Sequence, residues 1–177
     1  DLSSVFNEFK SQKIFTKMFS SDLGFANTKS RLRMMTLYQI ASSLEGGGLV
    51  VGTGNKVEDF GVGFFTKYGD GGVDISPIAD LYKTEVRELG KHLGVPQEII
   101  NAEPTDGLWD DNRTDEKQIG ASYEELEWVM EFGHNKNISS LTKKETNLIK
   151  TYMSFNNKNK HKMEPIPVFI LSENNII

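Results

Sequence analysis

Four basic residues stand where the sequence predicts that helices begin: Lys29, Arg31 and Arg33 near the start of one helix, and Lys83 at the start of another. A helix N-terminus carries partial positive charge, so cations there are unfavourable unless an anion compensates them. An anionic ligand or a carboxylate partner would compensate these cations. The alternative, which the residues alone favour, is that the long side chains simply extend their charged ends into water.

A glycine-rich segment, residues 52–55, directly follows the short apolar run 49–51. Ligands of parallel sheets bind beyond the carboxyl ends of the strands, where glycines let the backbone approach a nucleotide. Thr53 is thus a candidate nucleotide-binding residue. Glu58 is a candidate Mg²⁺ ligand, because carboxylates hold this ion next to phosphates. The alternatives are an ordinary turn and a solvated glutamate.

The aromatic pair Phe64-Phe65 lies in a glycine-rich run, residues 61–74. Paired aromatics offer a flat apolar wall that suits either a protein core or the ring of a ligand. Lys67 and Asp74 bracket the glycine turn with opposite charges. A hairpin packed by its phenylalanines fits the same residues, and the residue types alone do not separate the two interpretations.

The elements that must position these residues follow from periodicity and capping signals. Asn27 is the expected N-cap of the first helix, which carries an apolar stripe and stops at three glycines, and residues 49–51 are expected to form a buried strand. Ser122 with Glu125, and Thr142 with Glu145, form capping boxes. The expected helices span residues 28–44, 81–93, 96–102, 122–132 and 142–153.

A helix followed by a buried strand predicts an α/β fold with a parallel sheet. The chain, residues 1–177, has the size of a single domain. Residues 105–121 are expected to be a mobile loop. Residues 156–177 are expected to be a tail, extended from residue 165.

Composition narrows the possible classes of function. The net charge of −5 disfavours nucleic-acid binding, which needs a basic surface. No apolar run approaches the ~20 residues of a membrane span. The absence of cysteine excludes disulfides and fits the cytoplasm. The sequence does not begin with methionine, so we expect it to be part of a longer protein.

Several segments, in this order, resemble the NAD synthetase family, densely over residues 25–127. They are Asn27-Thr28-Lys29-Ser30-Arg31-Leu32-Arg33-Met34, Leu49-Val50-Val51-Gly52-Thr53-Gly54-Asn55-Lys56, the run from Gly63 to Asp74, Pro77-Ile78, Asp80-Leu81-Tyr82-Lys83-Thr84-Glu85-Val86, Glu103-Pro104-Thr105, Thr114-Asp115-Glu116 and Tyr123-Glu124. The resemblance implies a parallel-sheet, Rossmann-like fold of the adenine-nucleotide alpha-hydrolase type, here incomplete on its N-terminal side. It also implies an ATP-dependent ligase. ATP adenylates the nicotinate carboxylate of deamido-NAD, and ammonia, possibly derived from glutamine, then displaces AMP.

The resemblance also implies a role for individual residues. Arg31, Lys67, Asp74, His161 and Lys162 match residues that bind deamido-NAD. Thr53, Lys83 and Thr105 match ATP-binding residues, and Glu58 matches a Mg²⁺-binding glutamate. No residue is assigned as catalytic. The resemblance further implies a homodimer with the dinucleotide site at the subunit interface.

One departure from the family pattern bears on activity. Family members carry a Ser-Gly-Gly-x-Asp-Ser loop ahead of this region, which cradles pyrophosphate and supplies a Mg²⁺-binding aspartate, and this sequence does not contain it. A chain limited to these residues is therefore expected to be unable to adenylate its substrate. The alternative function is an inactive module for nucleotide binding or dimerisation.

Overall fold

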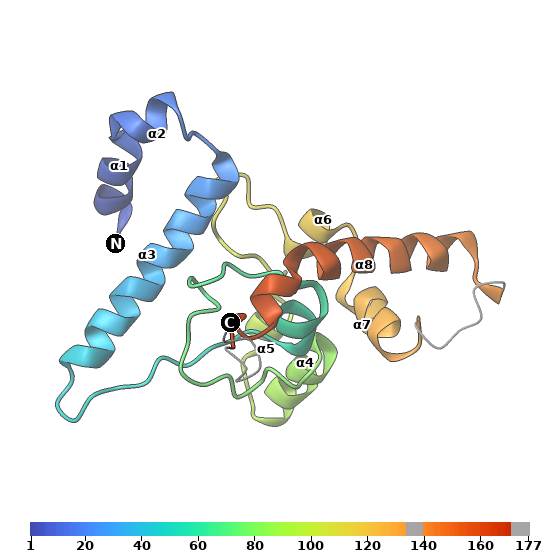
Figure 1. Ribbon diagram of the computed structural model, residues 1–177. Helices are drawn as coiled ribbons and strands as arrows, with labels where there is room; N and C mark the ends of the chain where they lie inside the picture. Colours follow the sequence, from blue (N-terminus) through green and yellow to red (C-terminus); the bar gives the residue numbers. More distant parts are fainter. Residues whose placement is uncertain (134–139, 171–177) are drawn as a thin grey trace.

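The computed structural model describes residues 1–133 and 140–170, and most of the regular structure in this part of the chain is helical (Figure 1). The N-terminal helices α1 and α2 sit at one end of the long helix α3. The bounds of the helices are α1 Ser3–Ser11, α2 Lys13–Lys17, α3 Asp22–Ser43, the π-helix η1 Val57–Val62, α4 Lys83–His92, α5 Gln97–Ile100, α6 Asp115–Ile119, α7 Tyr123–Glu131 and α8 Lys143–Met163.

The hydrophobic core lies where η1, α6, α7 and α8 meet. Helices α7 and α8 lie side by side, whereas α3 extends away from this group (Figure 1). The buried core residues are Val57, Val62, Ile119, Ala121, Tyr123, Leu126, Val129 and Tyr152. Burying each of the large apolar side chains contributes roughly 1.5–3 kcal/mol. This core therefore fixes η1, which carries Glu58, against the C-terminal half of the chain.

Side chains of α8 satisfy the carbonyl groups at the end of η1. The amides of Asn156 and Asn159 donate to the carbonyl oxygens of Gly61 and Val62, each at 2.8 Å, and the Lys162 ammonium donates to that of Gly63 at 2.8 Å. The three donors are spaced by three residues, so they share one face of α8. Because the last carbonyls of a helix have no partner within it, α8 caps η1 through its side chains.

Residues 49–51 do not form the buried strand that the sequence predicted. Val50 is buried, but Leu49 and Val51 are 67% and 54% exposed. The described residues contain one isolated parallel bridge, between Val51 and Ile75. Three backbone bonds accompany it: the Gly52 amide donates to the Ile75 carbonyl at 2.7 Å, and the amides of Asp74 and Ile75 donate to the Val50 carbonyl at 2.9 and 3.4 Å. The pairing is parallel, as expected, but the described residues do not confirm a parallel sheet.

The helix α3 begins earlier than predicted. It starts at Asp22, and its N-cap is Ser21, whose side chain accepts from the Gly24 amide, so Asn27 is not the cap. Lys29, the first of the three cations, consequently lies about two turns inside the helix, as do Arg31 and Arg33 beyond it. The argument from an unfavourable helix terminus is therefore wrong for these cations. It holds for Lys83, the first residue of α4.

The other predicted helices are present, with shifted ends. Helices α4, α5 and α7 lie within one or two residues of their predicted bounds. The predicted loop 105–121 contains α6, capped by Thr114. Helix α8 runs ten residues past its predicted end, so the expected tail 156–177 begins as helix. Residues 165–170 are non-helical, and the rest of the tail lies outside the described residues.

The apolar stripe predicted on the first helix is only partly buried. Ala41 is buried, but Met35 and Leu44 are more than half exposed. None of the helices in the described part of the chain combines the length and apolarity needed to cross a bilayer.

Replacing Gly63 by alanine tests the packing of α8 on η1. Gly63 has φ +61°, and a Cβ atom there would lie 2.5 Å from the Asn159 Cβ. We expect Gly63→Ala to lower the free energy of unfolding by about 2–4 kcal/mol, from backbone strain plus overpacking. Urea unfolding measures this free energy.

The matched control is Gly94→Ala. Gly94 has φ +74°, and a Cβ atom there would have nothing within 4 Å. This control reports backbone strain alone, about 1 kcal/mol. Equal losses in the two variants would contradict the close approach of α8.

Candidate functional site

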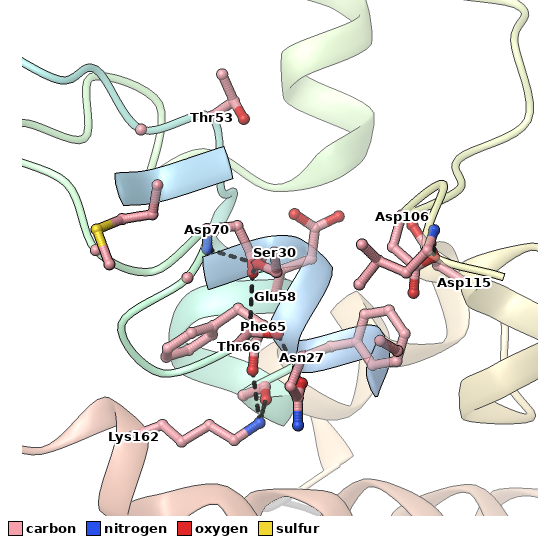
Figure 2. Close-up of a pocket in the computed structure, with 18 of the residues that line it drawn as sticks. Asn27, Ser30, Thr53, Glu58, Phe65, Thr66, Asp70, Asp106, Asp115 and Lys162 are labelled. Carbon is pink, nitrogen blue, oxygen red and sulfur yellow. Dashed lines mark hydrogen bonds between the residues drawn. The ribbon is translucent and has the colours of Figure 1, made fainter. Parts of the chain in front are cut away.

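A cleft of about 830 Å³ opens between α3, η1, the glycine-rich segments and the C-terminal end of α8. Figure 2 shows Thr53, Glu58, Phe65 and Lys162 bordering it, with Asp106 and Asp115 from the segment after α5. Residues from at least six separate parts of the chain thus converge on one space. A volume of this size is within the range of small-molecule and cofactor sites.

Six of the nine residues predicted for the site border this cleft. They are Thr53, Glu58, Lys83, Thr105, His161 and Lys162. This set includes every residue predicted to bind ATP or Mg²⁺. The remaining three, Arg31, Lys67 and Asp74, do not line the cleft.

Arg31 and Lys67 are linked to the cleft through a chain of hydrogen bonds. The Arg31 guanidinium donates to the Lys67 carbonyl oxygen at 3.2 Å, and the Lys67 ammonium donates to the His161 carbonyl oxygen at 2.6 Å. Lys162, the next residue, donates to the carbonyl oxygens of Gly63 and Phe65, and burial lowers the pKa of its ammonium. These cations therefore join α3, the glycine-rich run and α8 at one wall of the cleft.

Asp74 occupies a different position. One carboxylate oxygen accepts from the Val50 amide at 2.7 Å, and the other accepts from the Tyr38 hydroxyl at 3.1 Å. These bonds hold the start of the parallel pairing against α3. In this structure Asp74 supports the backbone next to Thr53 rather than facing the cleft.

The cations Lys29 and Arg33 hold the loop that carries Thr105. The Lys29 ammonium donates to the Leu108 carbonyl oxygen at 2.9 Å, and the Arg33 guanidinium donates to the carbonyl oxygens of Asp106 and Gly107 at 3.3 and 3.0 Å. In this structure the partners of these cations are main-chain carbonyls and, for Lys29, also the Asp110 carboxylate at 3.5 Å. Sequence reasoning allowed a carboxylate partner for these cations but did not identify the loop carbonyls.

Glu58 is surrounded by donors at the base of the cleft. Its carboxylate forms an ion pair with Lys83 at 3.4 Å and accepts a short hydrogen bond from the Tyr123 hydroxyl. A third donor, the backbone N–H of Asn55, lies 3.4 Å from the other Glu58 carboxylate oxygen. The side chains of Lys83 and Glu58 are only 24% and 16% exposed. Charge in this part of the cleft is therefore weakly screened.

Asp115 was not among the predicted site residues, although it borders the cleft next to Glu58. It is 7% exposed, and one of its carboxylate oxygens has no hydrogen-bond partner. The other lies 3.5 Å from the Tyr123 hydroxyl. Burial, together with the charges of Glu58 and Asp106, raises the pKa of Asp115 to about 6. Two sequence signals were available: Thr114-Asp115-Glu116 belongs to the segments that resemble the family, and Thr114 caps α6, which places Asp115 at its first position.

The residues around Glu58 fit a hard cation such as Mg²⁺ in part. The described residues contain no group of three or more His, Cys, Asp or Glu side chains that could hold a metal. Mg²⁺, however, is usually bound through one or two carboxylates, with waters and substrate phosphates completing its shell. Two observations agree with such a site. One oxygen of Asp115 has no hydrogen-bond partner, and the Lys83 ammonium, a cation, lies beside Glu58.

Comparison with known proteins places the chain in a family. The model of the NAD synthase family matches residues 1–166. The chain belongs to the NAD synthase family. It is 38% identical to the NH(3)-dependent NAD(+) synthetase of Sulfurisphaera tokodaii, covering 97% of this chain and 61% of that protein. It is 48% identical to that of Alkaliphilus metalliredigens, over 73% of this chain and 51% of that protein.

Solved structures support the same assignment. NMN synthetase from Francisella tularensis superposes with a TM-score of 0.75 at 32% identity, covering 98% of this chain and 64% of that one. NH3-dependent NAD synthetase from Campylobacter jejuni superposes with a TM-score of 0.67 at 26% identity, covering 96% and 64%. These neighbours are consistent with the Rossmann-like class of the family. The chain spans about half to three fifths of the length of the two curated relatives described above.

Replacing Asp115 by asparagine tests whether this carboxylate is held at the cost of stability. Its pKa is raised in the folded protein, so the folded state binds the proton more tightly than the unfolded state does. The carboxylate therefore lowers stability as pH rises from about 4 to about 6, and the cost persists above pH 6. Asn has no such cost. We expect Asp115→Asn to be more stable than the unaltered protein at pH 7.5 by about 1–2 kcal/mol, and nearly equal to it close to pH 4.

Thermal unfolding at several pH values measures this difference. The control is Asp80→Asn, which removes an aspartate whose side chain is almost fully exposed. It should change stability little at any pH. An Asp115→Asn protein less stable than the unaltered one at pH 7.5 would contradict the assignment.

Proposed function

We propose that this chain forms part of an NAD synthetase that converts deamido-NAD to NAD with ATP and ammonia, releasing AMP and pyrophosphate. The observation that carries the proposal is the convergence of Thr53, Glu58, Lys83 and Thr105 on one cleft, in a chain of the NAD synthase family. Ammonia is proposed as the nitrogen donor because the curated relatives are named NH(3)-dependent synthetases. Glutamine remains the alternative source of this ammonia.

The proposed reaction has two steps. The nicotinate carboxylate attacks the α-phosphorus of ATP, which forms an acyl adenylate and releases pyrophosphate. Ammonia then attacks the acyl carbon, and the bond to AMP breaks as the amide forms. Adenylation is needed because AMP is a far better leaving group than the oxide of a carboxylate.

The residues on the Glu58 side of the cleft are proposed to bind ATP. Lys83 would bind the phosphates, and Thr53 and Thr105 would contact the nucleotide from two loops on the cleft wall. Glu58 would bind Mg²⁺, which supplies charge neutralisation on the phosphates when it is present. The bonds from Lys29 and Arg33 to the loop carbonyls would set the position of Thr105.

The opposite wall is proposed to bind the dinucleotide. Lys67 and Arg31 join His161 and Lys162 there, and Phe65 lies beside them, 5.3 Å from the Lys162 ammonium to the ring centre. The aromatic ring would pack against the pyridine ring of deamido-NAD. Asp74 would contribute by holding Val50 and the segment that leads to Thr53. A homodimer with this wall at the subunit interface is part of the proposal.

A second acid substrate is favoured by one comparison. The Francisella tularensis neighbour is an NMN synthetase, so a mononucleotide acid is a candidate in place of the dinucleotide. Assays of the longer protein to which this chain is expected to belong, with ATP, ammonium and either acid, distinguish the two by product. We expect NAD to form faster from the dinucleotide than NMN forms from the mononucleotide. The reverse order would assign the protein to NMN synthesis. Binding of both nucleotides without pyrophosphate release would favour a module that only binds.

Replacing Lys67 tests the dinucleotide wall. Lys67→Ala removes the bond that holds the His161 main chain at this wall, so we expect deamido-NAD to bind about tenfold or more weakly, with ATP binding unchanged. Isothermal titration calorimetry measures both affinities. Lys91→Ala, which removes an exposed lysine paired with Glu88, is the matched control and should change neither. Unchanged deamido-NAD affinity in Lys67→Ala would rule out the proposed wall.

A further inference from the structure

The ion pair between Lys83 and Glu58 places a cation where the proposed function requires a metal. The Lys83 ammonium lies 3.4 Å from the Glu58 carboxylate and 5.1 Å from the centre of the Tyr123 ring. The Tyr123 hydroxyl donates to the same Glu58 oxygen. Lys83, which is expected to bind phosphate, is therefore paired with a carboxylate in this structure.

The charges of Glu58, Asp115 and Lys83 do not balance one another. Glu58 and Asp115 contribute two negative charges and Lys83 one positive charge, while the Tyr123 hydroxyl is neutral because burial and Glu58 raise its pKa. One Asp115 oxygen is buried with no partner in the described structure. A buried carboxylate oxygen without a partner is costly, so it indicates a site built for an additional positive group.

We propose that Asp115 joins Glu58 as a ligand in a binding site for a divalent cation, in addition to the loop aspartate that the resemblance implies, and that the Lys83 ammonium occupies this chain's part of the site until cation and nucleotide bind. The proposal rests on the function proposed above and adds Asp115 to its metal site. On binding, the cation takes the two carboxylates and Lys83 moves to the phosphates. The two roles of Lys83 are therefore successive states of one side chain.

The arrangement of the elements allows this exchange. Lys83 is the first residue of α4, and its side chain is a flexible stem with one compact charge. Glu58 is fixed on η1 by the core, and Asp115 is fixed at the start of α6. The two carboxylates are therefore held by rigid elements, and the cation between them is the mobile member.

Divalent-cation binding in the absence of nucleotide tests the proposal directly. Mn²⁺ serves as the probe, and the electron paramagnetic resonance signal of unbound Mn²⁺ reports its affinity for the purified protein. Lys83→Met removes the competing ammonium, so we expect Mn²⁺ to bind about tenfold or more tightly than in the unaltered protein. Lys91→Met, the same substitution at an exposed ion pair of α4, should leave the affinity unchanged.

Adding Asp115→Asn to Lys83→Met tests the second carboxylate. The double variant should lose the gain and bind no more tightly than the unaltered protein. Lys83→Gln repeats the test with a polar, uncharged side chain, and circular dichroism checks that each variant is folded. Affinity in Lys83→Met and Lys83→Gln equal to or weaker than that of the unaltered protein would overturn the exchange. A gain that survives Asp115→Asn would overturn the role of Asp115. The measurement uses neither ATP nor deamido-NAD, so its failure is distinct from failure of the amide-forming reaction.

Discussion

The contact between α8 and the end of η1 determines where the site residues lie. Three side chains of α8 satisfy successive carbonyls of residues 61–63, and Gly63 allows the close approach because it has no Cβ. The π-helix is a rare conformation that often occurs at functional sites. Here it carries Glu58, and the same contact places His161 and Lys162 at the edge of the cleft. One set of hydrogen bonds thus positions residues from both ends of the pocket.

Two carboxylates near Glu58 have raised pKa values. Asp115 and Asp59 are partly or wholly buried carboxylates, and burial together with the charge of Glu58 raises the pKa of each to about 6. Carboxylates with raised pKa values cluster at functional sites, which agrees with the proposed nucleotide and metal site. The cost in stability and the proposed function therefore arise from the same residues.

Local signals predicted the elements whose ends are set locally. The capping boxes at Ser122 and Thr142 were confirmed because each involves only four neighbouring residues. The start of α3 was missed because both Ser21 and Asn27 are good capping residues, and in the structure Ser21 is the N-cap. The end of α8 was missed because its polar residues 156–162 show no apolar stripe. They pack through hydrogen bonds to η1, which only the tertiary structure reveals.

The candidate site likewise contains residues that the sequence predicted and residues whose position depends on tertiary packing. Residue types and family resemblance predicted the residues that line the cleft around Thr53 and Glu58, and the structure brings them together. They did not predict Asp115, because its burial depends on packing between α6, α7 and η1. Nor did they predict that Lys29 and Arg33 would bind loop carbonyls, since an arginine next to a loop and one next to a phosphate look alike in sequence.

The bond from Lys67 to residue 161 ends on a main-chain oxygen, and this has an evolutionary consequence. Every amino acid carries that oxygen, so the bridge between the glycine-rich run and α8 does not depend on which side chain residue 161 has. The imidazole takes no part in the bridge. Selection is therefore able to change position 161 to suit a different bound molecule while the scaffold around it stays intact.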